Sequence, residues 1–117
     1  MSKHNETGVK GEQIAEKFLA EKGYRILHRN WCAGKKEIDI IAQWQDVLVF
    51  VEVKTRTSIH FSFPEEAVTP RKQQYLREAA QHYLDTIKNS LKIQFDVVSI
   101  YLFQDSVREI VHFEDAF

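Results

Sequence analysis

Apolar and polar residues alternate along two neighbouring stretches in the first half of the chain. The first stretch runs from Glu37 to Gln43, and the second contains Val49 to Lys54. A repeat of two residues is typical of a β-strand, in which successive side chains point to opposite faces of the sheet. The short polar segment from Trp44 to Asp46 favours a turn. We therefore predict an antiparallel hairpin whose valine-rich face is buried in a core.

The same alternation sorts the side chains of the hairpin into two faces. If the connecting loop has an even number of residues, opposed residues have numbers with an odd sum, and Asp39 shares a face with Glu52. An odd-numbered loop without a compensating bulge would place Asp39 on the opposite face. The first predicted face carries Glu37, Asp39, Ile41, Phe50, Glu52 and Lys54, and the second carries Ile38, Ile40, Ala42, Val49, Val51 and Val53.

Helical spacing of apolar residues predicts two helices. The first covers residues 8–22 and ends at Gly23, a natural left-handed stop. The second begins at Thr69-Pro70, where the hydroxyl caps the helix and proline takes the first position, and it should run to about Lys88 with Ile87 on its apolar stripe. The remaining segments are predicted as strands over 24–31, 92–102 and 107–113 and as a loop over 55–68.

These elements define an α/β fold in the order α-β-β-β-α-β-β. The third strand, the second helix and the fourth strand should form a right-handed parallel crossover. A chain of 117 residues is long enough for one domain and too short for two comfortable ones, so we expect a single domain over residues 1–117. The sheet should be mixed and flanked by the helices.

Two carboxylates and one ammonium group meet in the predicted hairpin. Opposed side chains have Cβ atoms roughly 5 Å apart, so Asp39 and Glu52 could share a magnesium or manganese ion, whose oxygen ligands lie about 2.1 Å away for Mg²⁺. The backbone carbonyl of Val53 could add a ligand, and Lys54 could orient a water or neutralise charge developing on a phosphate. The alternative is a surface cross-strand salt bridge, which also explains an acid two positions from a lysine.

The composition favours a cytoplasmic protein. Cys32 is the only cysteine, which excludes an internal disulfide and a cysteine-based zinc site. The segment from Met1 to Lys10 is polar, and no apolar run approaches the length needed to span a membrane.

A net charge of −1 argues against a nucleic-acid-binding protein, but the charges are unevenly distributed. Basic residues gather between Arg25 and Lys36 and again between Lys54 and Lys72, whereas acidic residues dominate from Phe95 onward. Separate basic and acidic surfaces and a merely mixed, solvated surface are both compatible with this pattern.

The element order, with an acidic residue on the second strand and Glu-x-Lys on the third, resembles the restriction-endonuclease-like fold of the PD-(D/E)xK nuclease superfamily. Ile38 stands where the superfamily's name includes proline, a position that varies among related nucleases. A closer resemblance, over nearly the whole chain, is to the YraN-like family of small bacterial proteins. It is carried by Gly8, Gly11-Glu12, Ala15, Phe18-Leu19, Gly23-Tyr24, Arg29-Asn30, Glu37-Ile38-Asp39, Ile41-Ala42, Phe50 to Arg56, Lys72, Ala79-Ala80, Tyr83-Leu84 and Phe95 to Val98.

The resemblance implies a nuclease-like domain similar to archaeal Holliday junction resolvases, which are metal-dependent and act as homodimers on branched DNA. By this likeness Glu12 would complete the metal site; its alternative role is helix N-terminal charge stabilisation, worth about 0.3–1 kcal/mol. Lys72 and Gln73 could contact phosphate near a helix N-terminus or lie in a solvated first turn. Lys36 and Arg56 are further candidates for nucleic-acid binding.

Asp96 and the histidines are less specific. Asp96 alternates with apolar residues in a predicted strand and fits a buried hydrogen-bonding group as well as a functional one. The histidines show no metal-ligand spacing: His28, His60 and His112 are predicted at the surface or in loops, and His82 on the second helix. Three aromatic residues could stack on exposed bases, although packing is the favoured role; they are Trp31, Phe61 and Phe63.

The sequence therefore predicts a metal-dependent endonuclease that acts on DNA phosphodiester bonds at branched or damaged structures, with Mg²⁺ or Mn²⁺ as cofactor. By analogy with the resolvases it would be a homodimer. The first alternative is a non-catalytic nucleic-acid-binding protein that retains the nuclease-like fold. The second is a protein interaction domain.

Overall fold

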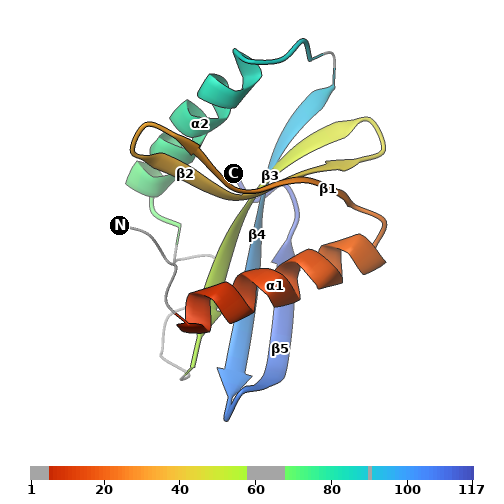
Figure 1. Ribbon diagram of the computed structural model, residues 1–117, viewed down its shortest axis with the longest axis vertical. Helices are drawn as coiled ribbons and strands as arrows, with labels where there is room; N and C mark the ends of the chain where they lie inside the picture. The colour runs from red at the N-terminus through yellow and green to blue at the C-terminus, as the bar shows by residue number, and fades with distance from the viewer. Residues whose placement is uncertain (1–5, 58–67, 90) are drawn as a thin grey trace.

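A five-stranded mixed sheet lies at the centre of the protein, with one helix on each face (Figure 1). The computed structural model describes residues 6–57, 68–89 and 91–117. Neighbouring strands are antiparallel except for the third and fourth, which are parallel. The elements, in chain order, are α1 (Glu6–Glu21), β1 (Arg25–Ala33), β2 (Lys36–Trp44), β3 (Val47–Arg56), α2 (Pro70–Leu84), β4 (Lys92–Phe103) and β5 (Ser106–Phe113). The predicted order and the parallel crossover are confirmed.

The hairpin of β2 and β3 has the predicted geometry. Gln45 and Asp46 form its loop, with Gln45 at a φ of 54°. The loop length is even, and Ile41 accordingly pairs with Phe50 and Ala42 with Val49. This register places the valines of β3 on the face covered by α1 and Phe50 on the face covered by α2.

Two residues of the hairpin depart from the predicted alternation. Asp39 was expected on the face of Glu52, but it lines a groove with residues of α1, whereas Glu52 contacts Lys72 of α2. Ile38 was expected beside Ile40, but it packs in the cluster under α2, whereas Ile40 packs under α1. Both predictions are wrong because the strand is irregular at this point. The ladder between β2 and β3 ends at Ile40, and Asn30 on the neighbouring strand β1 has a φ of 49°.

The second helix is shorter than predicted, because it ends at Leu84 rather than at about Lys88. The hydroxyl of Thr86 donates to the carbonyl of Tyr83 at 2.7 Å, so a side chain takes a carbonyl that a further helical turn would have used. Ile87 then lies outside the helix with 38% of its surface exposed, so it is not part of the buried stripe. The helix begins as predicted, with Thr69 accepting from the Lys72 N–H.

The other boundaries differ from the predicted ones by one or two residues. The first helix starts at Glu6 and is followed by Gly23 at a φ of 98°, as its role of left-handed stop requires. Of the predicted loop 55–68, Thr55 and Arg56 extend β3, Val68 is buried near α2, and residues 58–67 lie outside the described part of the chain.

Each helix covers its own apolar cluster. The cluster under α1 joins Ala15 and Leu19 to the valines of β3 and to Ile100 of β4, and the cluster under α2 joins Ala79 and Tyr83 to Phe50. Neither of the described helices is long and apolar enough to cross a membrane.

Helix α1 packs closely against β3 at Gly11. A methyl group built there would lie 1.8 Å from Thr55 Oγ1. Gly→Ala in a helix interior usually stabilises by about 0.5–1 kcal/mol; here we expect Gly11→Ala to lower the free energy of unfolding by about 1–3 kcal/mol through overpacking. Urea denaturation measures the change. The Gly11→Ala/Thr55→Ala double variant should recover part of the loss, and a Gly11→Ala chain that is more stable than wild type would contradict this close contact.

Candidate functional site

The candidate site forms where β2 separates from β3. Beyond the last ladder pair, Ile40 and Val51, the Asp39 carboxylate accepts a hydrogen bond from the Val53 N–H at 2.8 Å. Asp39 is 2% exposed. A buried backbone N–H needs a partner, and here a side chain provides it in place of the neighbouring strand. Asp39 therefore reaches β3 between Glu52 and Lys54, the two other members of the predicted motif.

A groove opens beside Asp39 between α1 and the first two strands. Its volume is about 430 Å³, and Glu12 lines it together with Asp39. Glu12 comes from the first half of α1 and is 9% exposed. Arg29 of β1 lies at the rim and forms an ion pair with Glu16 of α1. The structure thus brings the carboxylates of Glu12 and Asp39 to one groove.

Glu52 lies among lysines. Its side chain is buried, and its Oε2 is 3.8 Å from Lys54 Nζ and 3.7 Å from Lys72 Nζ. Lys72 lies in the first turn of α2, and its contact with Glu52 of β3 shows that its side chain points toward the sheet. This arrangement joins one buried carboxylate to two ammonium groups from separate elements.

The donors around Val53 suit a hard cation. Carboxylate and carbonyl oxygens are the ligands that Mg²⁺ prefers, and Mg²⁺ commonly binds through one or two carboxylates while keeping several waters. Within the described residues, no three histidine, cysteine, aspartate or glutamate side chains form a compact metal cluster. The carboxylates of Asp39 and Glu52 are of the kind that binds a magnesium ion which keeps several waters.

The three other residues predicted to bind nucleic acid, Lys36, Gln73 and Arg56, make different contacts in the structure. Lys36 Nζ is 3.6 Å from Glu78 Oε1 on α2. The side-chain amide of Gln73 donates to the Val68 carbonyl at 3.2 Å, which gives it a local role at the start of the helix. Arg56 ends β3, and its Nε is buried without a hydrogen-bond partner among the described residues. Lys36 thus reaches α2 from the hairpin through Glu78, and the Gln73 side chain is turned back to the segment that precedes its helix.

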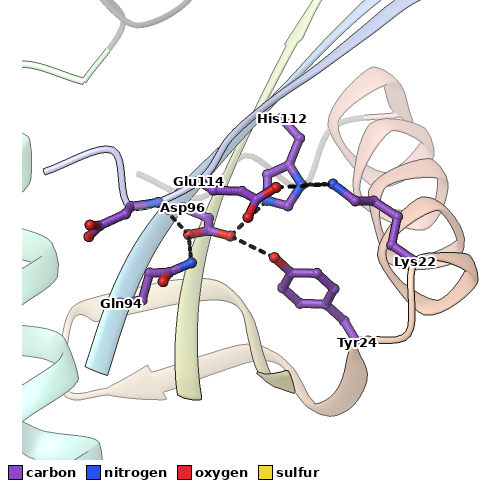
Figure 2. Close-up of polar contacts among 7 residues, drawn as sticks. Lys22, Tyr24, Gln94, Asp96, His112 and Glu114 are labelled. Carbon is purple, nitrogen blue, oxygen red and sulfur yellow. Dashed lines mark hydrogen bonds and ion pairs between the residues drawn. The ribbon is translucent and has the colours of Figure 1, made fainter. Parts of the chain in front are cut away.

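Asp96 lies at the centre of a second polar cluster (Figure 2). It belongs to β4 and is fully buried. One carboxylate oxygen accepts from Gln94 at 2.9 Å and from the Asp115 N–H at 3.0 Å, and the other lies 2.7 Å from His112 Nε2 and 3.4 Å from the Tyr24 hydroxyl. These contacts give Asp96 the role of a buried hydrogen-bonding group that ties the C-terminal segment to the sheet.

The prediction that His112 lies at the surface or in a loop is wrong. It belongs to β5, and its side chain is 4% exposed. Its Nε2 donates to Asp96, so Nδ1 accepts from Lys22 Nζ at 2.6 Å, and Lys22 also lies 3.5 Å from Glu114 Oε2 (Figure 2). The hydrogen bonds satisfy the polar atoms of the imidazole and explain why it tolerates burial.

Of the remaining aromatic residues and histidines singled out in the sequence, some pack against Tyr83 or lie exposed, and the others fall outside the described residues. Trp31 packs edge-on against Tyr83, 5.2 Å between ring centres, so it contributes to the cluster under α2. His28 is exposed and also contacts the Tyr83 ring, and His82 is exposed on α2. The three others predicted for this group, His60, Phe61 and Phe63, lie outside the described residues.

Sequence reasoning missed Tyr75 and the partners of Asp96. Tyr75 accepts from the Glu37 N–H at 2.7 Å and joins α2 to the tip of the β1–β2 hairpin. Only its place on the same helix face as Lys72 could have signalled a role. For Asp96, the single polar position among apolar neighbours was the signal, but its partners lie on other elements.

Tyr24 makes the stability of this cluster depend on pH. Burial raises the pKa of its hydroxyl well above the ordinary value, and the charges of Asp96 and Glu114 raise it further. Above about pH 10 the unfolded chain loses this proton while the folded chain keeps it, so stability should fall by up to about 1.4 kcal/mol per pH unit.

The test compares urea denaturation of wild type and Tyr24→Phe between about pH 9 and 11.5, a range that brackets the ordinary tyrosine pKa. Tyr24→Phe should show the shallower decline. Burial also raises the pKa of Tyr83, but Tyr83 is present in both chains and cancels in the difference. Equal slopes for the two chains would contradict the role of Tyr24.

The fold and the site define a small α/β protein with buried carboxylates and lysines where two central strands separate. Residues 11–100 match the family described as Uncharacterised protein family UPF0102. The chain belongs to this family, which confirms the resemblance to YraN-like proteins. The UPF0102 protein of Flavobacterium psychrophilum is 46% identical over 117 residues, which cover all of this chain and 98% of the relative. The UPF0102 protein of Syntrophomonas wolfei is 46% identical over 97% of this chain and 99% of its own.

Among solved structures, Pyrococcus furiosus SfsA in complex with Ca²⁺ aligns with 14% identity and a TM-score of 0.37. The alignment covers 91% of this chain, which spans 62% of the SfsA chain.

Proposed function

We propose that the protein is a metal-dependent endonuclease that cleaves phosphodiester bonds of DNA. The observation that carries this proposal is the hydrogen bond from the Val53 N–H to the Asp39 carboxylate. It brings an acidic residue of the second strand to the Glu-x-Lys segment of the third. This is the arrangement expected from the resemblance to restriction-endonuclease-like nucleases, and branched or damaged DNA is the substrate that the likeness to junction resolvases favours.

Asp39 and Glu52 would hold the ion, with the Val53 carbonyl and Glu12 as further oxygen donors. When bound, Mg²⁺ or Mn²⁺ polarises the scissile phosphate and lowers the pKa of a coordinated water. The position of Glu12 in the Asp39 groove supports its inclusion. In a β-strand the N–H and C=O of one residue point to the same side, so the Val53 carbonyl should face Asp39 as its N–H does.

Lys54 would act directly on the reacting groups. Its ammonium lies 3.8 Å from Glu52 Oε2 and 29% of its side chain is exposed, so it is both held by the site and open to a substrate. A fixed positive charge stabilises the negative charge that develops on a phosphate during cleavage. We assign it this role or the orientation of the attacking water.

A non-catalytic nucleic-acid-binding protein is the second candidate. It is favoured by the ion pairs of Glu52 with Lys54 and Lys72, because a carboxylate neutralised by two lysines can serve to hold those lysines for binding. This candidate predicts salt-dependent DNA binding without cleavage.

A cleavage screen separates the two candidates. The substrates are duplex, single-stranded, flapped and four-way DNA and a single-stranded RNA, each with Mg²⁺, with Mn²⁺ and with chelator. The endonuclease proposal predicts cleavage that requires metal and that Glu52→Gln abolishes, while Glu109→Gln, an exposed glutamate of β5, leaves it unchanged. Cleavage that survives Glu52→Gln would refute the assignment, and binding without cleavage on every substrate would favour the second candidate.

A further inference from the structure

Tyr75 lies where α2 meets the tip of the β1–β2 hairpin, which Figure 1 shows beside the helix. Its hydroxyl accepts from the Glu37 N–H at 2.7 Å and donates to the Lys35 carbonyl at 3.4 Å. Two hydrogen bonds from one hydroxyl thus hold the hairpin tip against the helix. The phenol ring is fixed at the junction of the two elements.

Two lysine ammonium groups lie over this ring. Lys72 Nζ is 4.3 Å and Lys36 Nζ 5.8 Å from the ring centre. Both distances are within the range in which an aromatic ring attracts a cation. About one third of each lysine side chain is exposed, 31% for Lys72 and 32% for Lys36, so each is packed along its stem and open to solvent at its end. The ring therefore restricts two cations that come from different elements.

The charges around Tyr75 favour an anionic ligand. Lys72 contacts Glu52 and Lys36 contacts Glu78, at 3.7 and 3.6 Å. Lys54 shares Glu52 with Lys72, and two exposed cations are the sequence neighbours of the lysines. These exposed residues are Lys35 and Arg71. Three lysines, Lys36, Lys54 and Lys72, thus outnumber the two carboxylates that they contact, Glu52 and Glu78.

We propose that Lys36 and Lys72, positioned by Tyr75, form a phosphate clamp that holds the backbone of a nucleic acid next to Glu52. This inference rests on the proposed function and deepens it, because it names the backbone phosphate as the group bound beside the cleavage site. Lysine binds phosphate as a point charge and reads no base sequence, so the clamp positions the strand without specifying it. Tyr75 is a positioning residue, since it acts through the two lysines.

The test is DNA binding measured by fluorescence anisotropy in chelator, over a series of salt concentrations, with a labelled duplex and a labelled single strand. Loss of one phosphate contact should lower the magnitude of the slope of log K against log salt by about 0.9 for the duplex and about 0.7 for the single strand. We expect this change for Lys36→Gln and for Lys72→Gln. Lys88→Gln, which removes an exposed lysine beyond the other end of α2, should leave the slope unchanged.

Two tyrosine variants separate positioning from folding. Tyr75→Phe keeps the ring beneath the lysines and should keep the wild-type slope, although it loses both hydrogen bonds to the hairpin. Tyr75→Leu removes the ring and should weaken binding severalfold and lower the slope toward those of the lysine variants. Circular dichroism and thermal unfolding of each variant confirm that binding is compared between folded chains.

Slopes of Lys36→Gln and Lys72→Gln equal to wild type, or an equal fall in Lys88→Gln, would overturn the phosphate clamp. A lower slope in Tyr75→Phe equal to that in Tyr75→Leu would overturn the positioning role of the ring. Because the assay contains no divalent metal and no cleavage step, it can fail while the endonuclease proposal stands. Conversely, if the lysine variants lower the slope as expected but no substrate is cleaved, the clamp stands and the protein is a nucleic-acid-binding protein rather than a nuclease.

Discussion

Asp39→Asn is expected to lower metal-dependent cleavage at least about a hundredfold while the fold remains intact. The amide oxygen can still accept from the Val53 N–H, the 2.8 Å hydrogen bond of the wild type. What is lost is the negative charge that would hold the ion. A bound metal ion stabilises the charge of the transition state by several kcal/mol, and each ~1.4 kcal/mol of lost stabilisation slows the reaction tenfold.

Asp39→Ala provides the matched comparison. It should lose cleavage to the same extent, but it also leaves the buried Val53 N–H without its partner, which costs about 1–3 kcal/mol of stability. The two variants thus separate the charge of Asp39 from its structural hydrogen bond. Single-turnover cleavage and urea denaturation give the two readouts. Wild-type cleavage by Asp39→Asn would refute the metal role of this residue.

Asp96→Ala is expected to lower the free energy of unfolding by about 3–5 kcal/mol. The substitution would leave His112 Nε2, the Gln94 amide and the Asp115 N–H without the carboxylate that accepts from them. Such a loss is a large fraction of the total stability of a small domain, about 5–15 kcal/mol. The measurement is the urea midpoint and slope at neutral pH.

Two further variants keep this prediction testable. Tyr24→Phe removes only the 3.4 Å hydrogen bond and should lose about 0.5–1.5 kcal/mol. Asp96→Asn keeps the shape and should lie between Tyr24→Phe and Asp96→Ala. Because no proposed ligand contacts Asp96, folded Asp96→Asn should retain metal-dependent cleavage. A loss below about 1 kcal/mol in Asp96→Ala would contradict the structural role, and a selective loss of cleavage would restore the functional alternative.

Most predictions that rested on local periodicity are confirmed, and the exceptions are Ile38, Asp39 and Ile87. The alternation through Val49, Val51 and Val53 identified the face of β3 that packs under α1, and the even loop at Gln45 set the register. Thr69 and Pro70 marked the start of α2 because the cap lies within one turn of the helix. In each case the interacting groups lie a few residues apart, where backbone geometry alone brings them together.

Predictions that required contacts between elements are incomplete or wrong. The face of Ile38 depended on where β2 leaves β3. The end of α2 depended on a local hydrogen bond, from the Thr86 hydroxyl to the Tyr83 carbonyl, which apolar periodicity does not show. The burial of His112 followed from Asp96 on the neighbouring strand and Lys22 at the end of α1. None of these partners can be identified by a repeat in the sequence.

By itself, the sequence determined the order of the elements, the two-faced hairpin and the Asp39 and Glu-x-Lys residues, since each is encoded by spacing along one or two adjoining strands. Only the tertiary structure decided that Asp39 bonds to Val53, that Glu12 enters its groove, and that Tyr75 and two lysines gather beside Glu52. The physical reason is that these contacts form when the two helices pack on opposite faces of the five-stranded sheet, and packing joins residues that lie far apart in the sequence.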